Sequence, residues 1–492
     1  MGLAGGPNGA KALFKHKFPD AFRSFQALEQ ARDAVGVARK QTLVVVDGNV
    51  LVMQTPAAVD TFPGYVAVLA NQLHGAIKAG EHVVVVFDEP ASLTRAKQEE
   101  QSKRDARRTP QTPVCSDDLV PCPRDDNYSR EELDAEGLNV RLLINHRPAR
   151  SRFYDALCVA ALAKLQHMLV GEEGCAWSVT FDGVDPRGAD RPLGEKRRPG
   201  VLSSHPEEWA PVLTREHAIG EGDMKLTDVC HRVHKLRKSN PDAAMGDVLL
   251  NLLWTIDTDS FLIELMQQSR REMRPRAEDR NELTMLCLRE PARRRKGEVP
   301  EPAYFQCIDM MCFHESVMAY VFGSRSVTPA LQEKKPLVTA LLAASIALCG
   351  CDFVEVRGLR ADLVLPCVRE VARNRPDLLE LMHGVYTGRA EDTRNAGEAI
   401  QAVIEDFLTS IAGAPRMKAA SQKAGSYSDL QVLRACWIAA YWNGNEFKNV
   451  RNWGFLHASN DNHTTTTATK RPAEGPPLVD LTTTTAMGDD NA

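Results

Sequence analysis

The chain has 492 residues, of which 43% are hydrophobic and 25% are charged, so most of it is expected to fold around a substantial core. The formal net charge of −5 excludes nucleic-acid binding through a global positive field and leaves only local basic patches for such a role. The twelve cysteines lack zinc-site spacing, and the longest apolar run, residues 337–349, is too short to span a bilayer. We expect a soluble intracellular protein in a reducing compartment, with no membrane partner.

The first two predicted strands are continuous runs rich in β-branched residues. Residues 42–47 (TLVVVD) and 82–88 (HVVVVFD) are typical of strands that are buried on both faces of a parallel sheet. Residues 59–78 between them have helical periodicity, so the three segments predict a strand–helix–strand unit. Further strands are expected at residues 177–181, 249–257 and 284–288. Further helices are expected at residues 152–169, 223–236, 337–349 and 399–411. This order predicts an α/β fold with a mostly parallel sheet flanked by helices.

Composition divides the chain into three parts. We expect one α/β region over residues 1–360, with insertions at about residues 109–150 and 182–218, where Pro-rich loops occur. A helical C-terminal extension is expected over residues 361–458. Residues 459–492 contain two Thr tracts and few apolar residues, so this tail is expected to be disordered.

Acidic residues recur where predicted strands end and at the start of one predicted helix. In open α/β sheets, sites form beyond the carboxyl ends of the strands, where the strand order reverses. We therefore expect these acids to meet at one edge of the sheet. They are Asp47, Asp88, Glu221, Asp223, Asp257, Asp259 and Asp352.

Each acid alone is equally consistent with a purely structural role, because Asp commonly caps a helix and acids are favoured at helix N-termini. Together they would repel one another, by roughly 4 kcal/mol for a pair about 4 Å apart at an effective dielectric of 20. Hard divalent cations such as Mg²⁺ or Mn²⁺ are the natural counter-charge for carboxylates. The sequence therefore predicts two Mg²⁺ or Mn²⁺ ions held by the seven acids, an arrangement suited to phosphodiester hydrolysis.

A basic segment, residues 94–108, follows the second strand. Helical spacing places Lys97 and Arg104 on one face with Gln101 between them, which would form a phosphate-binding surface next to the metals. The alternative is a solvated helix of mixed charge, because acidic residues interrupt the segment. The candidate phosphate-binding residues are Arg95, Lys97, Gln101, Lys103, Arg104 and Lys225.

The ordered set of motifs resembles the metal-dependent 5′-nucleases, a superfamily of PIN-like folds that includes flap endonucleases and Xrn-type 5′→3′ exoribonucleases. "GEGDMK" (residues 220–225) is similar to the Gly-Glu-Gly-Glu-His-Lys motif of the Xrn branch, and "VVVDGN" and "TIDTDSFLIEL" are similar to its first and Asp-x-Asp motifs. "RAKQEEQSKR" is similar to the basic motif that forms the 5′-phosphate pocket there, which implies that role for Lys97, Gln101 and Arg104. The resemblance covers residues 1–360 and implies a PIN-like nuclease.

Two departures keep more than one function open. The Xrn first motif carries a base-stacking His where this chain has Met53, and "GCDFVEVRGL" is spelled more like flap endonucleases and XPG-type nucleases. The favoured expectation is a 5′→3′ exonuclease. The alternatives are a structure-specific DNA flap endonuclease and a catalytically silent protein that binds nucleic acid or serves as a scaffold. The sequence does not distinguish RNA from DNA as the partner.

Overall fold

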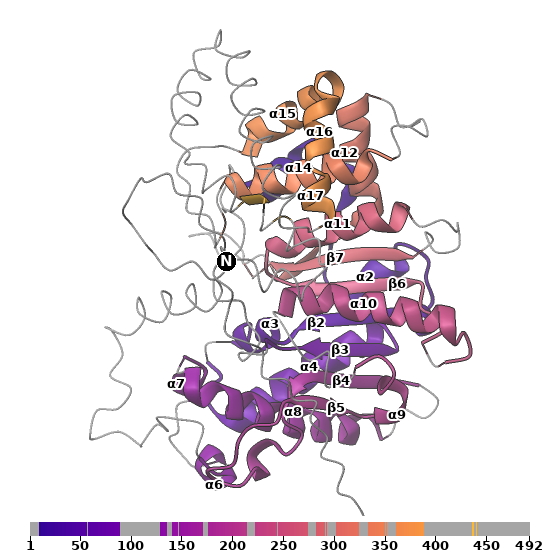
Figure 1. The fold of residues 1–492 in the computed structure, drawn as a ribbon. Helices are drawn as coiled ribbons and strands as arrows, with labels where there is room; N and C mark the ends of the chain where they lie inside the picture. The colour runs from indigo at the N-terminus through magenta and orange to yellow at the C-terminus, as the bar shows by residue number, and fades with distance from the viewer. Residues whose placement is uncertain are drawn as a thin grey trace, which may run out of the picture. The chain divides into compact units, whose positions relative to one another are not determined.

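The computed structural model describes residues 9–56, 58–88, 128–134, 140–145, 147–170, 176–213, 222–243, 245–273, 282–290, 292, 302–323, 333–349, 351, 361–387, 435, 436 and 439. Its centre is an eight-stranded mixed sheet in the order β1-β8-β7-β6-β2-β3-β4-β5 (Figure 1). The strands are β1 (Phe22–Phe25), β2 (Thr42–Asp47), β3 (His82–Val86), β4 (Ser178–Val184), β5 (Gly200–Ser203), β6 (Leu250–Thr255), β7 (Leu283–Glu290) and β8 (Tyr304–Asp309).

The five strands from β7 to β4 are parallel, and the edges of the sheet are antiparallel. β8 pairs antiparallel with β7, β1 with β8, and β5 with β4. The predicted α/β class with a mostly parallel sheet is confirmed, and each of the five predicted strands is present. Three strands were not expected: β1 and β5 at the two edges of the sheet, and β8 beside β1. Short segments of mixed polarity show little periodicity.

The strand order reverses at β2. Along the chain, β3 and β4 are added on one side of β2, whereas β6 and β7 are added on the other. Both β3 and β6 pair with β2 in parallel register, Val46 facing Val85 and Trp254. The carboxyl ends of β3, β2 and β6 therefore frame the switch point at which α/β sheets place their sites.

Helices cover both faces of the sheet and form two cores. One face carries α2 (Leu28–Asp33), α3 (Gly48–Met53), α4 (Phe62–Ala79), α6 (Arg130–Asp134), α7 (Val140–Asn145) and α8 (Arg147–Leu169). The other carries α1 (Ala10–Lys17), α9 (Pro206–Trp209), α10 (Gly222–Ser239), α11 (Asp259–Glu272), α12 (Met310–Phe322), α14 (Lys335–Leu348), α15 (Ala361–Asn374), α16 (Pro376–Leu381) and α17 (His383–Thr387). In Figure 1, α10 lies across the central strands, and it contacts β2, β3 and β6.

The helices predicted at residues 59–78, 152–169, 223–236 and 337–349 correspond to α4, α8, α10 and α14. The helix predicted at residues 399–411, the segment 109–127 and the tail 459–492 lie outside the described residues. The expected helical extension begins with α15, α16 and α17, whose buried residues share the core of α10, α11, α12 and α14. Across the described ranges, no helix combines the length and the apolar character that a membrane span needs.

The stretch expected as an insertion at residues 182–218 contributes to the sheet. β4 continues to Val184, and β5 pairs with it at the edge before α9 follows. Pro186, Pro192 and Pro199 lie in the connection between these two strands, whereas Gly183 lies at an irregularity in the β4–β5 pairing and Gly200 is the first residue of β5. The expectation of a separate loop was therefore wrong for this part of the stretch.

Candidate metal centre at the carboxyl edge of the sheet

Three of the predicted acids lie where the central strands end. Asp47 is the last residue of β2, and Asp88 and Asp257 follow β3 and β6 by two residues each. Because β3 and β6 flank β2 in parallel, all three carboxylates lie at one edge of the sheet. The negative charges of Asp88 and Asp257 both raise the pKa of Asp47, so both lie within electrostatic reach of it. We call these three residues the acid cluster.

Asp47 serves the fold as well as the cluster. Its carboxylate accepts a hydrogen bond of 2.9 Å from the backbone N–H of Asn49 and so caps α3, which begins directly after β2. Only 8% of the residue is exposed. This acid therefore does have the structural role of a helix cap, and the cap also fixes the carboxylate at the strand end.

Gly222 brings the start of α10 to the acid cluster. Its backbone N–H donates a 2.6 Å hydrogen bond to Asp88 Oδ1. A Cβ atom on Gly222 would lie 3.3 Å from Asp88 Oδ1 and 3.5 Å from Asp47 Oδ1, so the bare backbone lies against both carboxylates. Gly222 separates Glu221 from Asp223, and its position places the main chain of that motif at the site.

Asp257 and Asp259 form a short turn into α11. The N–H of Asp257 donates to Thr255 Oγ1 at 3.0 Å, and the N–H of Asp259 donates to Asp257 Oδ1 at 3.2 Å. Asp259 is the first residue of α11 and is 6% exposed. The Asp-x-Asp motif therefore lies after a predicted strand, at its junction with α11, a helix that was not predicted.

The acid cluster is electrostatically unfavourable as it stands. Burial, followed by the charge of Asp88 and then that of Asp257, raises the pKa of Asp47 to about 7, even though N–H groups of α3 oppose the shift. A carboxyl group held in this way gains from any positive charge that joins it. Carboxylate oxygens at a partly buried strand edge are the donors that Mg²⁺ and Mn²⁺ prefer, so the residues fit the predicted metal.

A complete ligand shell is not assembled within the described ranges. There, no group of three or more His, Cys, Asp or Glu side chains is close enough together to hold an ion. Because the three do not converge on one point, Asp47, Asp88 and Asp257 would hold a cation in part through water, which Mg²⁺ commonly retains. Glu221, Asp352 and the side chain of Asp223, which are the other expected ligands, lie outside the described residues.

Lys225 occupies a position inside the fold. Its Nζ donates to the carbonyl oxygen of Phe87 at 2.7 Å and pairs with Asp182 Oδ2 at 3.1 Å, and the residue is 3% exposed. Burial raises the pKa of Asp182, and the charge of Lys225 opposes that shift. The expectation that Lys225 holds a substrate phosphate is therefore corrected, because both acceptors of its ammonium lie within the protein. The other phosphate-binding candidates, Arg95, Lys97, Gln101, Lys103 and Arg104, lie outside the described residues.

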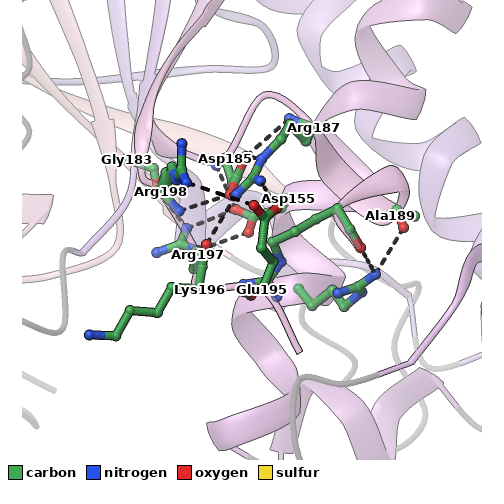
Figure 2. Close-up of polar contacts among 11 residues, drawn as sticks. Asp155, Gly183, Asp185, Arg187, Ala189, Glu195, Lys196, Arg197 and Arg198 are labelled. Carbon is green, nitrogen blue, oxygen red and sulfur yellow. Dashed lines mark hydrogen bonds and ion pairs between the residues drawn. The ribbon is translucent and has the colours of Figure 1, made fainter. Parts of the chain in front are cut away.

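Sequence reasoning missed Asp182, which lies near the end of the next parallel strand and pairs with Lys225. It also missed the ion-pair network at this end of β4, in which Figure 2 shows Asp155, Asp185, Arg187 and Arg197. Asp155 of α8 accepts two 2.8 Å hydrogen bonds from Arg197, which also donates to the Gly183 carbonyl oxygen at 2.6 Å. Asp185 pairs with Arg187 at 2.8 Å. The run "EKRRPG" was a visible signal of positive charge, but the pairing of Arg197 with Asp155 of α8 joins residues that are distant in sequence.

Comparison with known proteins assigns no family to the chain: no family model matches it, and no curated protein matches it. The chemistry of the acid cluster therefore rests on its own residues and their geometry.

Proposed function

We propose that the chain is a divalent-metal-dependent 5′→3′ nuclease with a PIN-like fold, which hydrolyses phosphodiester bonds at the 5′ end of RNA or DNA. The observation that carries the proposal is the placement of Asp47, Asp88 and Asp257 at one edge of the sheet, at or just after the ends of β2, β3 and β6, with Gly222 against two of them. A protein that only binds a polyanion gains nothing from a partly buried cluster of negative charges, because the cluster repels phosphates.

The residues of the site have two roles: the acids would bind the cations, and neighbouring groups fix the positions of the acids. When bound, divalent cations supply Lewis acidity and charge neutralisation at the scissile phosphate. Asp47 and Asp88 are fixed by backbone N–H groups of Asn49 and Gly222, so their oxygens are positioned before any cation arrives. Asp257 contributes from the opposite side of β2. Lys225 holds the end of β3 through the carbonyl oxygen of Phe87, the residue before Asp88.

The Xrn-like and flap-endonuclease alternatives differ in substrate and product. Incubation with 5′-phosphorylated RNA, single-stranded DNA and a DNA flap, with and without Mn²⁺, tests both when products are sized on a gel. The proposal expects Mn²⁺-dependent release of mononucleotides and preference for a 5′ monophosphate. An oligonucleotide released at the flap junction, independent of that phosphate, would favour the flap endonuclease. No cleavage of any substrate by protein that binds Mn²⁺ would favour a catalytically silent protein.

A further inference from the structure

The loop between β4 and β5, residues 185–199, leaves the sheet at its carboxyl edge, the edge that carries the acid cluster. β4 pairs parallel with β3, and the N–H of Phe87, next to Asp88, donates to the carbonyl oxygen of Asp182 at 3.1 Å. β4 is two strand spacings from β2, which is about 10 Å. One strand of a nucleic-acid duplex carries a phosphate about every 3.4 Å along the axis, so a strand that crosses this edge from the acid cluster reaches the loop within a few phosphates.

The loop is locally basic in a chain of negative net charge. Residues 185–198 include five Arg or Lys residues and three Asp or Glu residues, whereas the whole chain has a net charge of −5. One of the three acids, Asp185, has a fully buried side chain that pairs with Arg187 at 2.8 Å. The outer surface of the loop is therefore more positive than its composition, and a local patch of this kind attracts phosphates over a short range.

Internal contacts fix the loop at both ends (Figure 2). The carboxylate of Asp185 accepts hydrogen bonds from the backbone N–H of Arg187 at 3.1 Å and from that of Arg198 at 2.8 Å, so it joins the start of the loop to its end. The guanidinium of Arg197 binds both carboxylate oxygens of Asp155 on α8, each at 2.8 Å. The loop backbone is thus held in place before any ligand arrives.

Two cationic side chains of this fixed loop face outward. Lys196 is exposed, and Figure 2 shows its side chain extending away from the internal contacts. The side chain of Arg198 is 64% exposed, and its guanidinium lies 3.7 Å from the carboxylate of Glu195. Glu195 also pairs with Arg187. Because the backbone beneath these cations is already ordered, a polyanion that binds them pays little entropy for ordering the loop.

We propose that Lys196 and Arg198 bind backbone phosphates of the nucleic-acid strand held at the acid cluster, and that Glu195 competes with phosphate for Arg198. The proposal rests on the proposed nuclease function and adds to it a surface that positions the strand. Contacts to phosphates fix the register of a strand and carry no sequence information, so this surface serves any base sequence.

The test measures the binding of fluorescein-labelled, 5′-phosphorylated oligouridylate and oligothymidylate to the full chain by fluorescence anisotropy, in EDTA so that no cleavage occurs. The double variant Lys196→Gln/Arg198→Gln removes both outward charges and keeps the backbone N–H that Asp185 accepts. Glu195→Gln removes the competing carboxylate. Lys40→Gln is the control, because Lys40 is 67% exposed and lies just before β2, at the opposite edge of the sheet.

The two kinds of variant should act in opposite directions. The double variant should bind the oligonucleotides about tenfold more weakly, and the slope of log K against log salt should fall by about 0.7 for each phosphate contact that is lost. Glu195→Gln should bind about threefold more tightly, the effect of freeing one exposed cation from its ion pair. Lys40→Gln should match wild type. A purely structural role of the loop predicts no gain in affinity from Glu195→Gln.

Absence of binding to either oligonucleotide, or equal affinity of the double variant and wild type with both folded by circular dichroism, would overturn the surface. Loss of binding to oligoglutamate alone would assign it to an acidic protein partner and overturn the proposal as well. The gel assay for cleavage reports separately. Cleavage by wild type with unchanged oligonucleotide binding by the double variant would remove the surface and leave the nuclease. Charge-dependent binding without cleavage of any substrate would remove the nuclease and leave a nucleic-acid-binding loop.

Discussion

The backbone N–H of Gly222 and the carboxylate of Asp88 are joined by a 2.6 Å hydrogen bond across 134 positions of sequence. This bond ties the first residue of α10 to the end of β3. It links two motifs that the sequence presents separately, the Asp after a buried strand and the Gly between Glu221 and Asp223. The geometry of the acid cluster therefore depends on a glycine as much as on the acids.

Gly222→Ala is expected to lower Mn²⁺-dependent cleavage by about tenfold or more, because a misplacement of reacting groups by a fraction of an ångström is costly. The added Cβ would lie 3.3 Å from Asp88 Oδ1, so this carboxylate must shift by a few tenths of an ångström, whereas its distance of 3.5 Å to Asp47 Oδ1 is an ordinary contact. Initial cleavage rates measure the effect. Gly200→Ala is the control, because the nearest atom to its Cβ would be 4.0 Å away. Equal rates for Gly222→Ala and wild type would show that this contact does not set the site.

Asp47→Asn is expected to stabilise the metal-free protein at high pH. The folded pKa of Asp47, about 7, lies above its ordinary value of 3.8, so between these pH values the folded chain holds a proton that the unfolded chain has lost. The free energy of unfolding therefore falls as pH rises through this window, by roughly 1.4 kcal/mol per pKa unit at most. In EDTA at pH 8, the Tm of the variant should be higher than that of wild type, and at pH 4 the difference in Tm should be smaller. Asp242→Asn, at an exposed acid, is the control. A variant that melts below wild type at pH 8 would contradict the electrostatic account.

The sequence predicted strands correctly where every residue of the strand is buried. β2 and β3 are fully buried and consist largely of valine, and such continuous runs are typical of central parallel strands. β1 lies at the edge of the sheet and β8 lies beside it, and both were missed because polar residues such as Arg23, Ser24 and Gln306 break the apolar pattern. β5 is four half-buried residues in a Pro-rich stretch, and only its pairing with β4 makes it a strand.

The sequence predicted only those features of the site that follow from the order and direction of the strands. A parallel sheet brings the ends of β3, β2 and β6 to one edge, and the acids there follow. The direction of a side chain does not follow from spacing. Lys225 lies one turn into α10, where either a substrate phosphate or an internal carboxylate was possible, and Asp182 on β4 decides between them.

Manganese is expected to stabilise wild type and not the acid variants. A ligand that binds only the folded state raises its stability, by about 2.7 kcal/mol when its concentration is 100 times Kd. Asp257→Ala removes one carboxylate of the acid cluster, and Asp259→Ala removes its neighbour at the start of α11. Neither variant should show the Mn²⁺-dependent rise in Tm, and neither should cleave the substrate. In EDTA, Asp257→Ala should retain a Tm near that of wild type, because removal of a like charge relieves repulsion. Normal Mn²⁺-dependent activity in either variant would refute the metal assignment.

Lys225→Met is expected to destabilise the fold by about 3–5 kcal/mol, because it leaves Asp182 buried without its cation. Urea denaturation measures the loss. The double variant Lys225→Met/Asp182→Leu should recover most of it, since neither charge is then buried. If Lys225 instead served a substrate phosphate, the single variant would keep its stability and lose only activity.

Glu272 is expected to make the packing of α11 against α12 and α14 sensitive to acid. Burial raises its pKa, but a 2.6 Å hydrogen bond with His314 and the ion pair with Lys335 outweigh burial and lower the pKa to about 2 from 4.5. Since the folded pKa is depressed, the contribution to stability is complete above about pH 4.5 and is lost as pH falls through about 2; the shift corresponds to roughly 3 kcal/mol. Glu272→Gln should therefore be less stable than wild type at pH 6, and the gap should close toward pH 2. Urea midpoints at several pH values measure this, and Glu380→Gln, at an exposed pair on α16, is the control. A gap that stays constant down to pH 2 would show that Glu272 acts through packing and not through its charge.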